Sequence, residues 1–181
     1  MRLEAEIQLR IRFDDSGYFD NTRLISDPLF LERAVQHAVN RFAGTRVTKI
    51  LSPAVDGLPL AVILAHMLGI NLAIAKNTRE AGVNAFFEEA YVPGRSAMII
   101  NLYVPRDALR RADCVLIVDD VLDTGENQMA LARIAQKAKA EVAGVYALIG
   151  LNMACKTKME QVLHCPVEVV HQVGEKPVQR T

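Results

Sequence analysis

The sequence lacks the features that mark several classes of protein. Its 181 residues carry 21 basic and 21 acidic side chains, so no basic excess indicates general binding to nucleic acid. The three cysteines, Cys114, Cys155 and Cys165, are scattered and form no C-x-x-C pair, so neither a disulfide framework nor a zinc site is indicated. No apolar run reaches the roughly 18 residues of a membrane span. The charged N-terminus is no signal peptide. We therefore expect a cytoplasmic protein of one compact domain.

What the chain does have is a strand–loop–helix pattern that contains two adjacent acids. Residues 114–127 read C-V-L-I-V-D-D-V-L-D-T-G-E-N. The apolar run Cys114–Val118 predicts a buried parallel strand. Asp119 and Asp120 stand where it should end, and an alanine-rich helix follows from Asn127. Backbone N–H groups at the start of such a helix lack internal partners, which suits a phosphate. The acids suit ribose hydroxyls or a hydrated Mg²⁺, so a sugar phosphate fits both halves.

This stretch resembles the PRPP-binding motif of the type I phosphoribosyltransferases, where PRPP is 5-phosphoribosyl 1-pyrophosphate. The motif has four apolar residues, two acids, two apolar positions and a small residue before Thr-Gly-x-Thr, and Leu116–Asn127 matches it. Asn127 stands where the family usually has Thr or Ser, a phosphate ligand, and Glu126 adds a negative charge near the phosphate. Asp123 stands where the hypoxanthine-guanine members have an Asp close to the purine ring. A role for Asp123 as a cap of the turn is equally open.

Other classes of protein also place an acidic pair after an apolar strand. An NTPase would need a G-x-x-x-x-G-K-[ST] loop, which this chain lacks. A phosphoacceptor receiver domain has its acidic pair near the N-terminus and a lone Asp later, which is the wrong order here. The PRPP interpretation is therefore favoured over these two and over an unrelated α/β turn.

Strand-like and helix-like segments alternate along the chain. Residues 3–13 alternate with a period of two, which predicts a half-exposed strand, and Ser26-Asp27-Pro28 predicts the start of a helix that runs to Gly44. Further strands are expected over 47–51, 70–75, 96–104, 142–151 and 162–173, and helices over 58–68, 127–140 and 152–161. This order predicts an α/β fold with a mostly parallel twisted sheet and helices on both faces, as in type I phosphoribosyltransferases.

The resemblance also implies a domain plan. We expect one phosphoribosyltransferase-like domain over 1–181, with a core over about 25–160. A small hood, which covers the base in this family, would come from about 1–24 and 161–173. An acidic turn signal at 14–17 would lie in this hood, and a polar end over 174–181 is expected to be loose.

A second strand–loop–helix unit lies earlier in the chain. The loop Ser52–Gly57 is placed like the family's pyrophosphate loop, whose backbone amides bind the leaving group. The resemblance implies a non-proline cis peptide between Ala54 and Gly57. Lys76 fits the position of a pyrophosphate-binding lysine, and Arg79 either supplies a second charge or is a basic strand end exposed to water. The pyrophosphate-binding residues implied are Val55, Asp56, Gly57, Lys76 and Arg79.

Residues 80–95 show no strong periodicity, and a loop this long is usually functional or disordered. Its place is similar to that of the flexible loop that closes over the site in this family, so Glu88, Glu89 and Tyr91 are candidates for contacts made on closure. The Glu-Tyr-Gly pattern of the adenine enzymes is absent, and no catalytic glutamate is assigned. The rings that could stack on a base, each equally suited to the core, are Phe13, Phe19, Phe86, Phe87 and Tyr91.

The resemblance implies transfer of ribose 5-phosphate from PRPP to a purine base, which gives a purine nucleotide and pyrophosphate, with Mg²⁺ as cofactor. Asp119 and Asp120 would bind ribose hydroxyls or the waters of the metal, and with Asp123 they are the candidate catalytic residues. The residues implied to hold the ribose 5′-phosphate are Asp123, Thr124, Gly125, Glu126 and Asn127. A homodimer is expected, with no membrane or nucleic-acid partner.

Two alternatives stay open. One is a PRPP-binding regulatory protein without turnover, which Glu126 and Asn127 keep open. The other is an orotate-type pyrimidine phosphoribosyltransferase.

Overall fold

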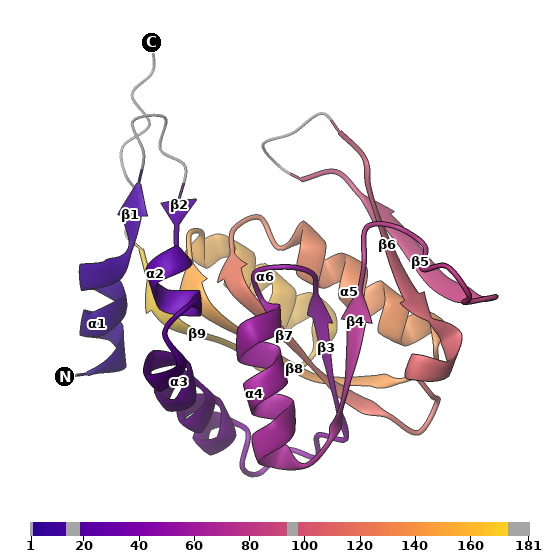
Figure 1. The fold of residues 1–181 in the computed structure, drawn as a ribbon, viewed down its shortest axis with the longest axis horizontal. Coiled ribbons are helices and arrows are strands. Elements are labelled where there is room, and N and C mark those ends of the chain that lie inside the picture. Colours follow the sequence, from indigo (N-terminus) through magenta and orange to yellow (C-terminus); the bar gives the residue numbers. More distant parts are fainter. Residues whose placement is uncertain (1, 14–18, 94–97, 174–181) are drawn as a thin grey trace.

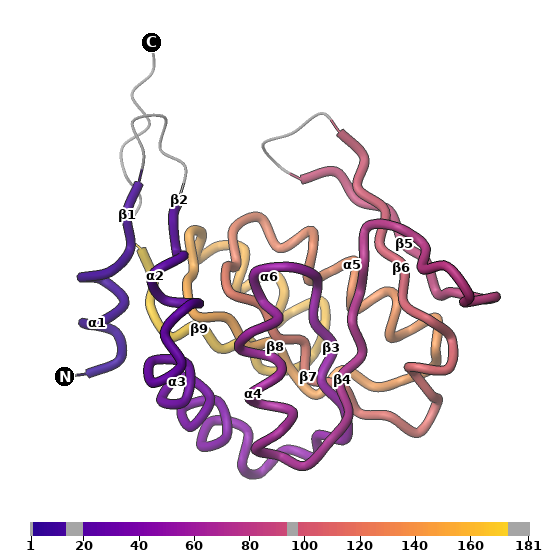
Figure 2. The backbone as a smooth tube through the Cα atoms, viewed as in Figure 1, coloured from indigo at the N-terminus to yellow at the C-terminus, as the bar shows by residue number. Residues whose placement is uncertain are grey.

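The chain folds around a parallel sheet, drawn as a ribbon in Figure 1 and as a tube in Figure 2. The computed structural model describes residues 2–13, 19–93 and 98–173. The sheet has five strands in the order β4-β3-β7-β8-β9, and neighbouring strands are parallel. The strands are β3 (Lys49–Pro53), β4 (Asn71–Ala75), β7 (Cys114–Leu122), β8 (Glu141–Gly150) and β9 (Val167–Gln172). Because parallel strands end at one edge, the loops that follow them gather there.

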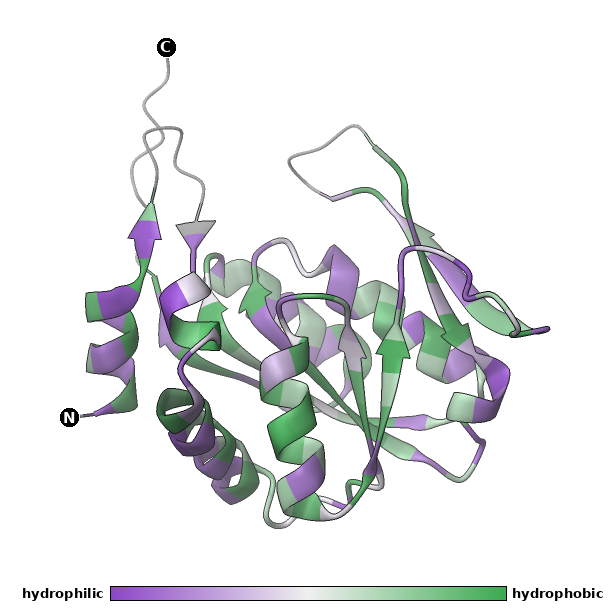
Figure 3. Cartoon of the chain, in the orientation of Figure 1, coloured by the Kyte–Doolittle hydropathy of each residue, from purple (hydrophilic) through white to green (hydrophobic). Residues whose placement is uncertain are grey.

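Helices cover both faces of the sheet (Figure 1). One face packs against α3 (Pro28–Arg41) and α4 (Leu58–Leu68), and the other against α5 (Glu126–Lys137) and α6 (Met153–Leu163). Figure 3 shows that apolar residues dominate α4. Within the described ranges, no helix is both long and apolar enough to span a membrane. The predicted sheet with helices on both faces is confirmed.

The start of α3 follows its sequence signals. The Asp27 side chain accepts hydrogen bonds from the backbone N–H groups of Leu29, at 3.0 Å, and Phe30, at 3.1 Å. These contacts satisfy two donors that have no partner inside the helix. Pro28 occupies the first turn, where its missing N–H costs nothing. The short helix α2 (Thr22–Ile25) comes just before, and a 3₁₀ turn, η1 (Arg106–Ala108), precedes β7.

The strand predicted over 3–13 is wrong for most of its length, because residues 3–10 form the helix α1 (Leu3–Arg10). A helix lets Glu6 contact Arg10 one turn later at 2.5 Å and Arg33 of α3 at 2.6 Å. It also buries Ile7 completely. These tertiary contacts override an alternating pattern. Within residues 3–13 only β1 (Arg12–Phe13) is a strand, and it pairs with β2 (Phe19–Asp20). The expected turn at 14–17 lies outside the described residues.

The first helix and the last strand lie together at one edge of the sheet. α1 contacts β9, and Figure 1 shows α1, β1 and β2 beside it. β9 itself is hydrogen-bonded to β8 as the edge strand of the main sheet, so the C-terminal segment adds to the sheet as well as meeting the N-terminal one. The division into a core and a hood stays a prediction.

Part of the loop predicted over 80–95 is a strand. β5 (Phe86–Tyr91) pairs antiparallel with β6 (Ile100–Pro105), so the strand expected over 96–104 begins later and ends one residue further on. The loop prediction fails because Glu88 and Glu89 break the apolar alternation, yet Glu89 forms ion pairs with Arg133 and Lys137 of α5 at 2.7 and 2.6 Å. The tip of this hairpin, 94–97, lies outside the described residues.

Candidate active site

The acidic pair lies at the carboxyl edge of the sheet, in the last part of β7. Asp119 and Asp120 are 4% and 8% exposed. The loop after β3 presses directly onto them: a Cβ at Gly57 would lie 2.8 Å from Asp119 Oδ1 and 3.1 Å from the hydroxyl of Ser52. The two loops that sequence analysis linked to pyrophosphate and to ribose phosphate therefore meet at Asp119.

Hydrogen bonds from three donors hold the Asp119 carboxylate in place. The side-chain amides of Asn127, at 3.0 Å, and Gln128, at 2.7 Å, both donate to Oδ2. The backbone N–H of Asp120 donates to Oδ1 at 3.0 Å. Burial, followed by the charge of Asp120, raises the pKa of Asp119 well above its ordinary value. Asp119 is thus a fixed group with few directions left for a ligand.

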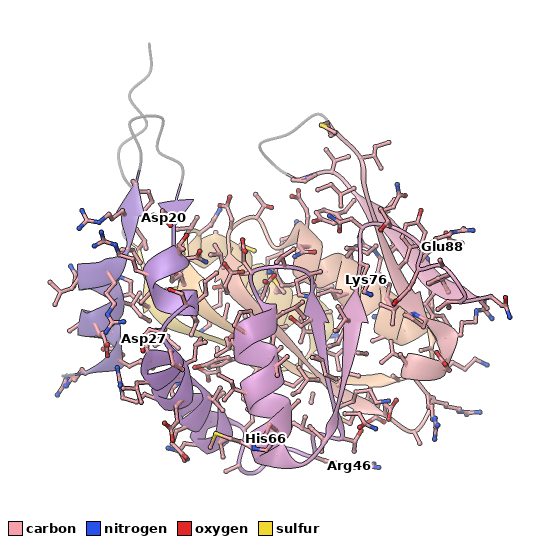
Figure 4. All side chains as sticks on the ribbon, in the orientation of Figure 1. Asp20, Asp27, Arg46, His66, Lys76 and Glu88 are labelled. Carbon is pink, nitrogen blue, oxygen red and sulfur yellow. The ribbon has the colours of Figure 1, made fainter. Side chains whose placement is uncertain are left out.

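Asp120 is held from a different part of the chain. The side-chain amide of Asn21, just before α2, donates to Asp120 Oδ2. Asn21 is itself 8% exposed. Its neighbour Asp20, labelled in Figure 4, is the last residue of β2 in the N-terminal hairpin. The N-terminal segment therefore contacts the acidic pair directly.

The turn after β7 has the form expected of a phosphate loop. Gly125 adopts φ +78°, in the left-handed region that favours glycine. A Cβ there would lie 2.4 Å from the sulfur of Cys155 and 2.8 Å from that of Met159. α5 begins at the next residue, so its first N–H groups face this turn. Glu126 accepts a hydrogen bond from the Thr124 hydroxyl at 2.5 Å, which keeps its charge at the loop.

A pocket of about 190 Å³ opens over this turn. Its lining comes from the end of β5 and from the loop and first turn after β7: Tyr91, Pro93, Val121, Asp123, Thr124, Gly125, Asn127 and Gln128. Burial, and then the charges of Asp119 and Glu126, raise the pKa of Tyr91. The pocket brings four of the five predicted 5′-phosphate residues together with Tyr91, and the ligand roles assigned to them stay predictions.

The predicted pyrophosphate loop also lies at this edge. The Ala54–Val55 peptide is cis, within the expected stretch. Val55 is 74% exposed. Partial burial, and then the charge of Asp120, raise the pKa of Asp56. The loop is joined to β4 through a hydrogen bond from Ala54 N–H to Ala75 O at 2.9 Å.

The two basic residues that were predicted to bind pyrophosphate each form an ion pair with a glutamate. Lys76, directly after β4, forms an ion pair with Glu80 at 2.8 Å. Arg79 forms one with Glu88 at 2.8 Å and lies over the ring of Tyr103, 5.3 Å from its centroid. Figure 4 shows Lys76 at the carboxyl edge and Glu88 further out on the hairpin. Lys76 is therefore placed beside the pyrophosphate loop, whereas Arg79 packs against the hairpin β5–β6.

Sequence reasoning missed two residues of the site. Gln128 is 2% exposed and also donates to Val121 O at 3.0 Å. Its signal was available, because it shares a helix face with the buried residues Leu131, Ala132 and Ala135. A polar residue on such a face needs a partner. Asn21 carried no local signal, because its partner lies 99 residues away.

The described side chains supply only part of the coordination shell that a metal ion would need at this site. The part of the chain that is described holds no group of three or more His, Cys, Asp or Glu side chains suited to a metal ion. Two adjacent carboxylates with a phosphate loop beside them suit Mg²⁺ that keeps several waters and takes other oxygens from a substrate. The donor set fits a substrate-bridged Mg²⁺ and does not form a protein cage.

The acidic pair and the two loops thus lie at the carboxyl edge of a parallel sheet, where proteins of this fold class bind their ligands. A family model described as "Phosphoribosyl transferase domain" matches residues 31–178. The chain belongs to this family, and the resemblance of Leu116–Asn127 to its PRPP motif is confirmed.

Named relatives differ in how much of their length the chain covers. It is 29% identical to a xanthine phosphoribosyltransferase of Heliobacterium modesticaldum over 65% of this chain and 63% of that protein. It is 29% identical to an adenine phosphoribosyltransferase of Rhizobium johnstonii over 82% and 83%. It is 25% identical to a probable purine biosynthesis transcriptional regulator, PurR, of Streptococcus pneumoniae over 79% of this chain, but spans only 52% of the regulator.

Among solved structures, an adenine phosphoribosyltransferase from Rhodothermus marinus superposes with a TM-score of 0.81 at 25% identity, covering 94% of this chain and 98% of that one. The described residues therefore have the fold of a phosphoribosyltransferase.

Proposed function

We propose that the protein transfers the 5-phosphoribosyl group from PRPP to a purine base and releases pyrophosphate. One observation carries the proposal: the phosphate loop after β7 and the loop after β3 converge on a single buried carboxylate, Asp119. PRPP carries a phosphate at one end of its ribose and a pyrophosphate at the other, so it needs two anion sites with hydroxyl-binding acids between them. The xanthine and adenine enzymes among the relatives support a purine as acceptor.

We assign each part of PRPP to one part of this site. The 5′-phosphate would lie against the backbone N–H groups of 124–127 at the start of α5. Asp119 and Asp120 would accept hydrogen bonds from the ribose hydroxyls, with Asp119 held in place by Asn127 and Gln128. The pyrophosphate would lie on the loop 54–57, with Lys76 beside it.

The reaction breaks the bond between ribose C1 and pyrophosphate and forms a bond from C1 to a ring nitrogen of the base. Positive charge develops on the ribose in between, and we assign its stabilisation to the carboxylates of Asp119 and Asp120. β5 ends at Tyr91, which lines the pocket and would help to exclude water there. Bound Mg²⁺ would neutralise charge on the leaving pyrophosphate, and Asp119 and Asp120 would hold it through its waters.

Asp123 is the residue we assign to the base. It lines the pocket beside the phosphate loop, where its carboxylate would accept a hydrogen bond from a purine N–H. A role as cap of the turn is compatible with the same position, and substitution separates the two: Asp123→Asn would weaken use of the base without changing PRPP affinity only if Asp123 contacts the base.

A PRPP-binding regulator without turnover is the second candidate. The similarity to PurR supports it, as do Glu126 and Asn127 in place of the family's usual phosphate loop residues. The Thr124 hydroxyl, which could donate to a phosphate, is bonded instead to Glu126. An orotate-type enzyme stays a prediction that the same assay tests.

Pyrophosphate release in the presence of Mg²⁺ and PRPP tests the proposal. Adenine, guanine, hypoxanthine, xanthine, orotate and uracil would be supplied separately to the purified protein. Release with a purine alone supports the enzyme and identifies its substrate, and release with orotate alone contradicts the purine assignment. If no base causes pyrophosphate release while PRPP still raises the melting temperature, the result favours the regulator.

We also propose that the protein is a cytoplasmic homodimer. Dimers are common in its family, and analytical ultracentrifugation at several concentrations tests the oligomeric state. Cell fractionation with an antibody to the chain tests the location.

A further inference from the structure

Asn127 differs from the other residues of the phosphate loop because its side chain turns inward. Its Nδ2 donates to Asp119 Oδ2 at 3.0 Å. Its Oδ1 is buried and has no hydrogen-bond partner among the described residues. The residue nevertheless lines the pocket above the loop. The Nδ2 of Asn127 is thus hydrogen-bonded to Asp119, while its Oδ1 is an acceptor without a donor in the described part of the chain.

The contact with Asp119 decides which way the amide points. The reverse orientation would place Oδ1 against a carboxylate oxygen, and two acceptors cannot share a hydrogen bond. Gln128, whose Nε2 also donates to Val121 O, donates to the same Oδ2 at 2.7 Å, so this oxygen already acts as an acceptor. The contact with Asp119 therefore leaves Oδ1 of Asn127 unpaired within the described ranges. A buried acceptor without a donor is costly and rare in native proteins.

The chemistry of an amide oxygen limits what can satisfy it. A fully ionised phosphate oxygen is an acceptor and offers it no proton. A ribose hydroxyl or a water bound to Mg²⁺ is a donor, and both are expected beside Asp119. Asn127 is thus suited to a different part of the substrate from the Thr or Ser usual at this position, whose hydroxyl can donate to phosphate.

We propose that Asn127 binds the sugar end of the substrate: its Oδ1 accepts a hydrogen bond from a ribose hydroxyl, or from a water on the metal beside it, while Nδ2 holds Asp119. This inference rests on the proposed function, because it assumes that PRPP occupies the site. It makes Asn127 a determinant of specificity for a ribose that carries hydroxyls. The 5′-phosphate is then held by the backbone N–H groups of the loop alone.

Calorimetry with matched ligands and variants tests this assignment. The ligands are PRPP, ribose 5-phosphate, its 2-deoxy and 3-deoxy analogues, and inorganic phosphate, each with Mg²⁺. The variants are Asn127→Ala and Asn127→Thr, and the control is Gln136→Ala, an exposed amide on the same helix. The wild type and the control should prefer ribose 5-phosphate over one deoxy analogue by about tenfold, which equals about 1.4 kcal/mol. Both Asn127 variants should lose that preference and keep their affinity for inorganic phosphate.

The two donor sources give different results. A hydroxyl donor predicts the lost preference just described. A metal-bound water predicts that neither deoxy analogue is discriminated by the wild type, and that Asn127→Ala raises by about tenfold the Mg²⁺ concentration needed for PRPP binding. Either pattern supports the assignment.

Three results would overturn it. Equal loss of affinity for every ligand, inorganic phosphate included, would make Asn127 a phosphate ligand. Unchanged affinities in both variants, at any Mg²⁺ concentration, would make its orientation purely structural. Retained discrimination in Asn127→Thr would show that the amide oxygen is not needed. A wild type that binds neither PRPP nor ribose 5-phosphate would instead remove the proposed function itself, so the two failures are distinguishable.

Discussion

Gly57→Ala is the substitution that tests the convergence of the two loops most sharply. The backbone at Gly57 has φ −72° and ψ −19°, which alanine adopts readily, so the substitution adds no backbone strain. The added Cβ would lie 2.8 Å from Asp119 Oδ1 and 3.1 Å from Asp119 Cα. Because one of these neighbours is backbone, the clash cannot be relieved by rotation of a flexible side chain.

The size of the effect follows from this contact. Overpacking of a well-packed interior costs about 1–3 kcal/mol. Relief requires the loop 54–57 or the Asp119 carboxylate to move, and each belongs to the proposed PRPP site. If the cost falls on the bound state, PRPP affinity drops by about 5-fold to 150-fold. Isothermal titration calorimetry with PRPP and Mg²⁺ measures this directly, beside a thermal melt.

Gly44→Ala is the matched control, because a Cβ at Gly44 meets no atom within 4 Å. It should leave PRPP affinity and the melting temperature unchanged. Wild-type affinity together with a wild-type melting temperature in Gly57→Ala would refute the argument that the pyrophosphate loop and Asp119 form one site.

Two further predictions concern stability. Gln128→Ala removes a donor from the buried Asp119 and should lower the free energy of unfolding in urea by about 1–3 kcal/mol, whereas Gln136→Ala, exposed on the same helix, should have little effect; equal losses would contradict this account. Burial, and then the charge of Arg41, lower the pKa of His37. The unfolded chain therefore binds a proton more readily, and stability should fall as the pH drops below about 6.5. His37→Gln should flatten that dependence in melts between pH 7.5 and 5.5, and an unchanged slope would count against it.

Much of the site could be predicted because its signals are local. The order of strand, acids, glycine turn and helix in 114–137 is written in consecutive residues, and the structure keeps it. Gly57 and Gly125 likewise stand where the backbone approaches another element closely. The parallel sheet followed from alternation of elements, because parallel strands need helical crossovers.

What could not be predicted depends on contacts between distant parts of the chain. α1 was read as a strand because its period of two is real, and Arg33, which fixes Glu6, lies 27 residues away. β5 was missed because its charged residues are satisfied by α5. The inward turn of Asn127 depends on Asp119, on the preceding strand. Sequence could identify Asn127 as a departure from the family motif, but not the direction of its amide.

The central claim is that PRPP binds at the acidic pair, and the most direct test is calorimetry of PRPP with Mg²⁺ on the wild type and on Asp120→Asn. Asp120→Asn keeps the shape of the side chain and removes its charge. Asp107→Ala, an exposed acid in η1, serves as control. We predict that the wild type and Asp107→Ala bind PRPP equally and that Asp120→Asn binds at least about tenfold more weakly. Equal binding by all three proteins, or no binding of PRPP by the wild type, would contradict the account.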